Sequence, residues 1–199
     1  MTKPIILLDC DQCVLDYNKR VGDIFKELFG YEPLVKNPKA YKAVNIYDFS
    51  TLTQKENDFF KQYASGPNMW DKMNPMPGAK EMVDQLSHDH DVIIFTGMNP
   101  DFKSIREKNL RDLGMNIKDV VAVANSRNFN AKEKYAREIN AKFFIDDLLQ
   151  YFVGLQDIST ELVLLDHGYN DGANNEEERR NVLVNHTVTS LEQVVKLIC

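Results

Sequence analysis

Short runs of consecutive apolar residues recur along the chain, and polar, helix-like stretches separate them. A strand that is buried on both faces is apolar at every position, so runs of this kind favour a parallel sheet over a half-exposed antiparallel one. Their alternation with helical patterns is typical of a sheet covered by helices on both sides. We therefore predict an α/β fold with a five-stranded parallel sheet sandwiched by helices. The five runs are residues 5–8, 92–95, 120–124, 143–145 and 162–165.

Helices are expected between these runs. Residues 79–87 follow the breaker pair Pro77-Gly78, and residues 101–113 open with Asp101 and stop at Gly114. Such start and stop residues bracket helices because they satisfy or release the end groups of the backbone. Residues 131–139 and 190–198 complete the predicted set.

Residues 17–74 break this rhythm. They are rich in aromatic residues and lysines, with helical patterns at 22–29 and 54–63 and no convincing buried strand. The segment Pro75-Met76-Pro77-Gly78 marks the return to the sheet, since prolines punctuate such junctions. We expect a core domain formed by residues 1–16 and 75–199 and a helical cap formed by residues 17–74. Residues 174–180 are expected to form a polar surface loop.

The composition agrees with one ordinary globular core plus an insertion. The chain has 199 residues, of which 43% are hydrophobic and 27% charged. A formal net charge of −6 argues against a nucleic acid polymer as a partner, because binding phosphates along a polymer requires a basic surface. The first apolar run is too short for a signal peptide or a membrane span, so we expect a cytoplasmic protein that does not bind membranes. The sequence leaves a homodimer open.

Three cysteines are present, and Cys10 and Cys13 form a C-x-x-C pattern. No second such pair and no histidine pair at ligand spacing follows. A redox or zinc role is therefore a minor alternative.

Polar side chains with chemical potential follow the apolar runs. Ligands of open α/β sheets bind beyond the carboxyl ends of the strands, so these side chains should share one edge. Carboxylates gathered there repel one another unless a cation joins them, and oxygen ligands favour Mg²⁺. The residues concerned are Asp9 and Asp11 after the first run, Thr96 and Gly97 after the second, Asp146 and Asp147 after the fourth, and Lys132, or its close rival Lys134, on the intervening helix.

This set of residues suits phosphoryl transfer. A carboxylate such as Asp9 can attack phosphorus and form an aspartyl-phosphate that water later hydrolyses. Asp11 would stand close enough to move a proton, and Thr96, Gly97 and a lysine would hold the phosphoryl oxygens.

The order D-x-D, strand-end Thr, Lys, strand-end D-D resembles the four motifs of the haloacid dehalogenase superfamily. The resemblance covers residues 1–16 and about 75–170 and implies a Rossmann-like core with bound Mg²⁺. It makes Asp9 the nucleophile and Asp11 the general acid/base. It also implies that Thr96 and Gly97 in IIFTG and Lys132 bind phosphate, and that Asp9, Asp11, Asp146 and Asp147 surround the metal ion.

The stretch LLDCDQCVLDY and the return N-P-M-P-G-A resemble the 5′(3′)-deoxyribonucleotidase-like subfamily. Two positions depart from its pattern: Gln12 stands where glycine is usual, and Cys13 where valine or threonine is usual. Because Asp11 is retained, phosphoester hydrolysis fits better than dehalogenation, which does not need that second aspartate.

We therefore predict a Mg²⁺-dependent phosphomonoesterase that acts on a small phosphorylated metabolite, with a nucleoside monophosphate as one candidate. A phosphosugar mutase with the same aspartyl-phosphate is one alternative. A metal- and phosphate-binding domain without turnover is another, with Gln12 and Cys13 as signs of drift. A phosphoacceptor receiver domain fits less well, because its motifs would come in another order.

Several further residues have simple structural interpretations. Asp16 is expected to cap the first cap helix or to reach the site. His88 and His90 precede a strand and are expected on the surface at the far edge, whereas His167 follows the fifth run on the site's edge. Arg127, after the third run, is a weak candidate for substrate contact. The cap aromatics are expected to form the cap's own core rather than a base-stacking platform; they are Tyr41, Tyr47, Phe49, Phe59, Phe60, Tyr63 and Trp70.

Overall fold

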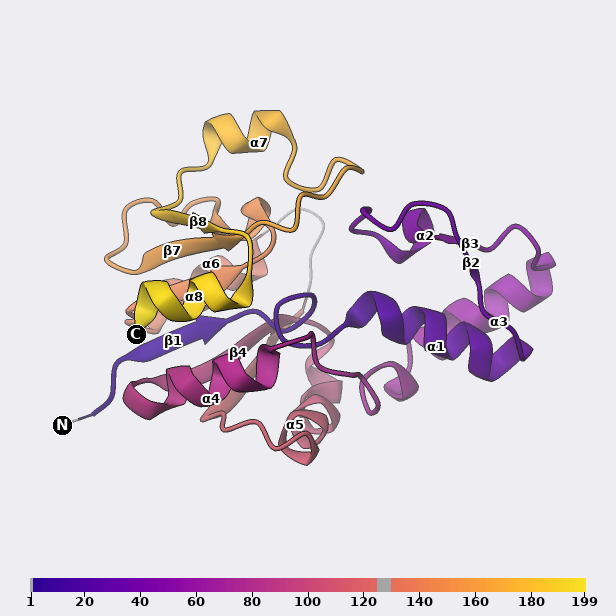
Figure 1. The fold of residues 1–199 in the computed structure, drawn as a ribbon, viewed down its shortest axis with the longest axis horizontal. Coiled ribbons are helices and arrows are strands. Elements are labelled where there is room, and N and C mark those ends of the chain that lie inside the picture. The colour runs from indigo at the N-terminus through magenta and orange to yellow at the C-terminus, as the bar shows by residue number, and fades with distance from the viewer. Residues whose placement is uncertain (1, 125–129) are drawn as a thin grey trace.

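The computed structural model describes residues 2–124 and 130–199. Over these residues the core is one sheet of six parallel strands in the order β5-β4-β1-β6-β7-β8 (Figure 1). The predicted α/β class with a parallel sheet is therefore confirmed. The strands are β1 Ile5–Leu8, β4 Asp91–Gly97, β5 Asp119–Val123, β6 Phe143–Asp146, β7 Glu161–Leu165 and β8 His186–Val188.

The expected number of five strands was wrong, because β8 adds a sixth at the edge of the sheet. This strand has only three residues, and its pairing with β7 places Val188 opposite Leu165. Asn185 extends the pairing, since its backbone N–H donates to the carbonyl of Leu162 at 2.9 Å. A strand this short, containing a histidine and a threonine, has no apolar run to reveal it.

Helices cover both faces of the sheet. Along β1, Ile6 and Leu8 pack on one face and Leu7 on the other, as the alternation of a strand requires. The Ile6 face is covered by α4 Ala79–Asp89, α5 Lys103–Asp112 and α8 Leu191–Ile198. The Leu7 face is covered by α6 Ala131–Glu138 and the 3₁₀ turn η3 Leu149–Phe152. A further 3₁₀ turn, η2 Pro100–Phe102, precedes α5.

Two local expectations were wrong. The segment expected as a polar loop contains the helix α7 Glu176–Asn181, which Asn175 begins by accepting the N–H groups of the first turn while Glu178 caps Asn175 in return. A charged helix with no apolar face gives no periodic signal. His90 is buried rather than on the surface, and its ring packs 6.3 Å from that of Phe143.

The chain leaves the sheet after β1 and forms a separate lobe (Figure 1). Asp16 caps its first helix, since the N–H of Lys19 donates to Asp16 Oδ1 at 2.8 Å. The only strands described in this lobe, β2 and β3, are short and not buried. No described helix is long and apolar enough to cross a membrane. The lobe contains α1 Tyr17–Phe29, β2 Leu34–Val35, α2 Ala43–Ile46, β3 Tyr47–Asp48, α3 Gln54–Ala64 and the 3₁₀ turn η1 Pro67–Met69.

Most of the lobe's aromatic residues form its own small core around Phe25, as the sequence predicts. Tyr47, Phe49 and Phe60 belong to this core, whereas Phe59 is 53% exposed. Tyr41 lies outside it, with its ring 5.2 Å from that of Tyr169 in the loop after β7. The aromatics therefore do not behave as one group, because Tyr41 contacts the core domain.

Candidate active site

The carboxyl ends of β1 and β6 meet at Asp9. Its backbone N–H donates to the carbonyl of Ile145 at 2.9 Å, which fixes the end of β1 against β6. The side chain of Asp9 contacts Lys132 through Oδ1, and the same ammonium lies 2.6 Å from Asp146 Oδ2. Residues separated by more than 100 positions are thus joined at one edge of the sheet, as the sequence predicts for these three side chains.

Lys132 reaches the site from the first turn of α6. Asn130 begins that helix by accepting the N–H of Lys132 at 3.1 Å, and its amide is tied to the carbonyl of Tyr151 at 2.9 Å. Burial acts to lower the pKa of Lys132, but the Asp146 and Asp9 carboxylates raise it above its ordinary value. Lys132 is fully buried, whereas the side chain of its rival Lys134 is 67% exposed. The structure therefore brings Lys132, a charged ammonium, into the site and leaves Lys134 on the surface.

The two consecutive aspartates at the carboxyl end of β6 have different partners. Asp146 accepts the N–H of Leu148 at 2.9 Å in addition to Lys132. Asp147 points elsewhere and accepts the hydroxyl of Tyr169 at 2.6 Å. Burial raises the pKa of both carboxyls, and the nearby Asp9 carboxylate raises both further. Lys132 opposes the rise in the pKa of Asp146, whereas Asp146 adds to the rise in the pKa of Asp147. Such crowding of buried carboxylates favours a cation between them.

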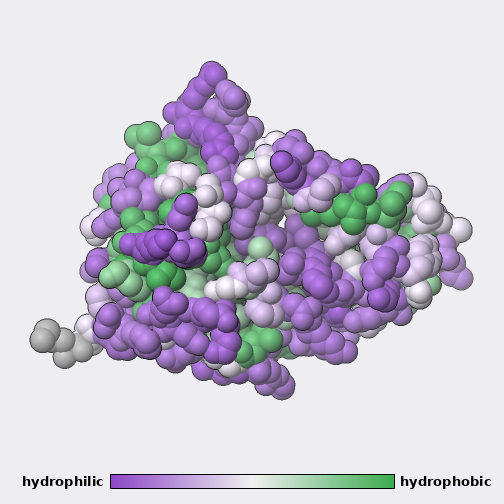
Figure 2. All heavy atoms as spheres, viewed as in Figure 1, coloured by the Kyte–Doolittle hydropathy of each residue, from purple (hydrophilic) through white to green (hydrophobic). Residues whose placement is uncertain are grey.

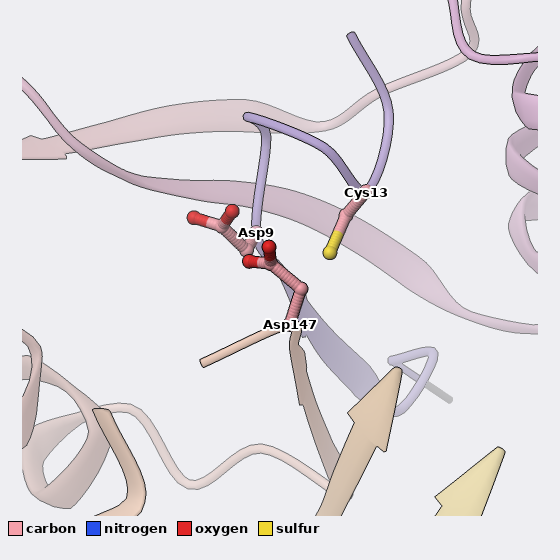
Figure 3. A group of neighbouring side chains, drawn as sticks. All are labelled: Asp9, Cys13 and Asp147. Atoms are coloured by element: carbon pink, nitrogen blue, oxygen red, sulfur yellow. The ribbon is translucent and has the colours of Figure 1, made fainter. Parts of the chain in front are cut away.

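Figure 3 shows the side chains of Asp9, Asp147 and Cys13 pointing toward one another. One ligand atom from each lies within 4.8 Å of the others. The two carboxylates fit a hard cation such as Mg²⁺, whereas the thiol is a soft donor. Burial, together with the Asp147 carboxylate, raises the pKa of the Cys13 thiol, which is therefore a neutral neighbour of the pair. Cys13 was not among the expected site residues.

The turn after β1 explains the position at which glycine is usual. Gln12 has a φ of 65°, in the left-handed region that favours glycine. Hydrogen bonds from the N–H groups of Val14 and Leu15 to the carbonyl of Cys10, both 2.8 Å, close this turn. His167 supports it from the loop after β7, with Nε2 2.9 Å from the carbonyl of Gln12. Through this contact His167 supports the turn beside the site.

Asp11 lies apart from the Asp9–Asp147 pair and is bound to Arg106 of α5. Nη2 of Arg106 donates to Asp11 Oδ1 at 2.8 Å, and the arginine side chain is fully buried. Burial raises the pKa of Asp11, and the Arg106 guanidinium partly opposes that rise. The sequence analysis missed Arg106. The available signal is its spacing of four from the buried Leu110, which places a cation on the inner face of α5.

Thr96 is the last residue but one of β4, in register with Ala122 of β5. It is fully buried, and its Oγ1 has no hydrogen-bond partner among the described residues. Buried hydroxyls are nearly always paired, so an orphan at this place is suited to an oxygen of a bound ligand. Gly97 follows it and lines the adjoining cavity.

That cavity, of about 610 Å³, lies between the core and the lobe. Figure 2 shows a hollow between the two. Arg127, the weak candidate for substrate contact, lies outside the described residues. The cavity is lined by Asp11, Gln12, Tyr17, Asn18, Tyr41, Lys42, Ala43, Val44, Trp70, Gly97, Met98, Asn99 and Ala124.

Solved structures share this fold. YfnB of Bacillus subtilis, described as a HAD-hydrolase and solved with bound magnesium, aligns with a TM-score of 0.65 at 16% identity, covering 100% of this chain and 99% of that chain. A protein of Clostridium difficile described as a phosphatase aligns at 0.64 and 15% identity, covering 100% of both chains. A haloacid dehalogenase-like hydrolase of Streptococcus pneumoniae aligns at 0.63 and 12% identity, covering 99% of both. At these identities the likeness shows the fold.

The sequence itself matches a family model. Residues 3–182 match the model described as 5′ nucleotidase, deoxy (Pyrimidine), cytosolic type C protein. No curated protein matches the sequence. Because the matched segment spans most of the chain, the protein belongs to this family of 5′-nucleotidases.

Proposed function

We propose that the protein is a Mg²⁺-dependent phosphomonoesterase that uses Asp9 as its nucleophile on a small phosphorylated substrate. The observation that carries the proposal is the meeting of Asp9 with Lys132 and Asp147 at the carboxyl ends of the strands. The family description supports a nucleoside monophosphate, in particular a deoxypyrimidine 5′-monophosphate, as the substrate class, and it supports a cytosolic location.

Asp9 and Asp147 would hold the metal ion through their carboxylate oxygens. Bound there, Mg²⁺ would offset the charge of the carboxylates and of the phosphoryl group. We assign Asp146 and Asp11 to supporting positions around this pair, because their side chains already bind Lys132 and Arg106.

The remaining residues divide the work of the reaction. A carboxylate oxygen of Asp9 forms a bond to phosphorus while the ester oxygen leaves, and Asp11 gives that oxygen a proton. Thr96 Oγ1, Gly97 and the Lys132 ammonium would hold the phosphoryl oxygens. Asp11 then takes a proton from water, which attacks the aspartyl-phosphate and releases inorganic phosphate.

The lobe formed by residues 17–74 would act as the cap that selects the substrate. Its contribution to the cavity includes Tyr17, Tyr41 and Trp70, which offer aromatic surface opposite the polar edge of the sheet. We propose this division of labour with a core formed by residues 1–16 and 75–199.

The test is a screen for phosphate release from nucleotides, sugar phosphates and amino-acid phosphates with Mg²⁺. We expect Asp9→Asn to abolish release from the best substrate. Asp89→Asn, an exposed aspartate at the opposite edge of the sheet, should retain full activity. Full activity in Asp9→Asn would end the proposed mechanism. Transfer of phosphate back to the substrate would indicate a mutase, and Mg²⁺-dependent binding without any product would indicate a silent domain.

A further inference from the structure

Arg106 is a fully buried cation outside the expected phosphate and metal contacts. Its Nη2 donates to Asp11 Oδ1 at 2.8 Å, and its Nη1 lies 3.3 Å from Cys10 Sγ. Its guanidinium carbon lies 4.8 Å from the centre of the Trp70 ring. Burying a guanidinium costs free energy unless an anion pairs with it. The anion that pairs with Arg106 is the Asp11 carboxylate.

The pairing restrains Asp11 without covering it. Asp11 lines the cavity, its side chain is 23% exposed, and among the described residues only Arg106 hydrogen-bonds to its carboxylate. Arg106 thus holds Oδ1 of Asp11, and no described residue donates a hydrogen bond to Oδ2. A general acid needs this arrangement, because it must be oriented and must still reach the reacting atom.

The same helix also contacts the segment that returns from the cap. Asn109, one turn after Arg106, donates to the carbonyl of Met73 at 3.3 Å, and Arg106 stacks on Trp70 of that segment. Residues three apart share a helix face, so α5 presents both contacts together. The orientation of Asp11 is therefore linked to the place where the cap rejoins the core.

We propose that Arg106 is a positioning residue that orients the Asp11 carboxylate for proton transfer to the leaving group. The proposal rests on the proposed phosphatase function. A positioning role can be told from a purely structural one by a measurement. If Arg106 positions Asp11, the loss of kcat/KM in an Arg106 variant depends on the leaving group of the substrate.

Alkyl phosphates such as nucleotides release a strongly basic alkoxide and need a proton from Asp11. An aryl phosphate such as p-nitrophenyl phosphate releases a weakly basic phenolate and needs none. The constant kcat/KM includes only the steps up to departure of the leaving group. A misplaced general acid should therefore lower kcat/KM for the nucleotide far more than for the aryl ester.

The experiment compares kcat/KM for a deoxypyrimidine 5′-monophosphate and for p-nitrophenyl phosphate in four proteins. We expect Arg106→Met to lose on the order of 10²-fold on the nucleotide and less than about 10-fold on the aryl ester, from the usual size of general acid catalysis. Arg106→Lys keeps the charge without the planar fork and should recover part of the loss. The control Arg111→Met removes an exposed arginine of the same helix, paired with Glu107, and should match the wild type.

A double variant provides a second readout. If Arg106 acts through Asp11, Asp11→Asn with Arg106→Met should be no slower on the nucleotide than Asp11→Asn alone. Thermal unfolding checks that each variant is folded. If Arg106→Met does not fold, Arg106→Lys must show the same preference for loss on the nucleotide, at smaller size.

Equal losses on the two substrates, or additive losses in the double variant, would overturn the positioning role while leaving the phosphatase function intact. A wild-type protein that hydrolyses neither substrate, nor any other in the screen, would instead overturn the proposed function.

Discussion

Gln12 occupies a backbone conformation that few side chains adopt. Its φ of 65° lies in the left-handed region, and its side-chain nitrogen Nε2 is buried with no hydrogen-bond partner among the residues that the structure describes. The resemblance of the sequence to the nucleotidase-like subfamily implies glycine here, and the turn geometry supplies the physical reason. The backbone at Gln12 is thus strained, and the hydrogen bonds of the turn hold it in this conformation.

Replacing Gln12 by glycine should stabilise the protein. Relief of the left-handed strain should stabilise the folded state by about 1–2 kcal/mol. Glycine also makes the unfolded chain more flexible, which offsets roughly 0.5–1 kcal/mol of this. We therefore expect the free energy of unfolding to rise by about 0.5–1 kcal/mol. Urea denaturation measures it. As a control, Gln85→Gly in the exposed face of α4 should lower stability by about 1 kcal/mol. A loss of stability in Gln12→Gly would show that the side chain's packing outweighs the strain.

Thr96→Val should separate activity from stability. Thr96 Oγ1 has no hydrogen-bond partner within residues 2–124 and 130–199, so its removal should leave the free energy of unfolding unchanged or slightly raised. If the hydroxyl holds a phosphoryl oxygen, kcat should fall by roughly 10²–10³-fold. Thermal melts and phosphate release measure the two effects.

The matched control is Thr160→Val. This buried threonine donates to the carbonyl of Ala141 at 2.8 Å, at the opposite edge of the sheet. Here stability should fall by about 1 kcal/mol while activity remains. Retained activity in Thr96→Val would remove Thr96 from the proposed site.

At the scale of elements, the loop after β7 binds the lobe of residues 17–74 through hydrogen bonds to Asp171, a contact called the clasp below. Asp171 of this loop accepts the backbone N–H groups of Tyr41 and Lys42 at 3.0 and 3.1 Å and the amide of Asn45 at 2.8 Å. It thereby satisfies N–H groups at the start of α2. In the same loop Tyr169 donates to Asp147, so one segment contacts both the candidate metal pair and the lobe of residues 17–74.

The clasp should weaken in acid. Burial acts to raise the pKa of Asp171, but hydrogen bonds from Asn45 and from the Tyr41 and Lys42 backbone outweigh it and lower the pKa. A lowered folded pKa contributes stability that is present above the unfolded value of about 4 and is lost as pH falls through the folded value. Asp171→Ala should therefore lower the free energy of unfolding at pH 7 and have progressively less effect below about pH 4.

Chemical unfolding across pH 3–7 measures the difference in the free energy of unfolding between wild type and Asp171→Ala. If this difference stays constant over the range, the carboxylate charge does not contribute to the clasp. Lys39 and Asn170, which form a neighbouring backbone contact at 3.1 Å, remain in the variant and keep the comparison local to Asp171.

At the scale of the whole molecule, Mg²⁺ should stabilise the folded protein. The carboxylates of Asp9 and Asp147 are brought close only by folding, so an ion held between them would bind the native state and not the unfolded chain. Linkage predicts a gain of about 2.7 kcal/mol at 100 times the dissociation constant. Phosphatase activity should vanish on chelation and return with Mg²⁺.

Asp147→Asn tests the origin of this gain. The variant should lose most of the Mg²⁺-dependent rise in Tm, yet melt higher than wild type in chelator, because a buried charge has been removed. Asp89→Asn should keep the full rise. An undiminished rise in Asp147→Asn would place the metal ion elsewhere.

Much of the fold could be predicted because strands that are buried on both faces show up as runs of consecutive apolar residues. Strands covered on both faces, such as β1 and β6, must be apolar throughout, and helices such as α4 must begin and end at recognisable residues. The short edge strand β8 and the charged helix α7 escaped prediction for the complementary reason. They are stabilised by pairing and capping rather than by an apolar pattern.

The amino-acid pattern alone predicts the buried strands and places Asp9, Thr96 and Asp146 at or just past their carboxyl ends, which parallel strands bring to one edge. The partners of these groups follow from the three-dimensional fold instead. It bound Asp11 to Arg106, 95 residues away, and placed Cys13 beside Asp9 and Asp147. Such contacts depend on the rotation of helices and the path of loops across the sheet, and no local pattern records either.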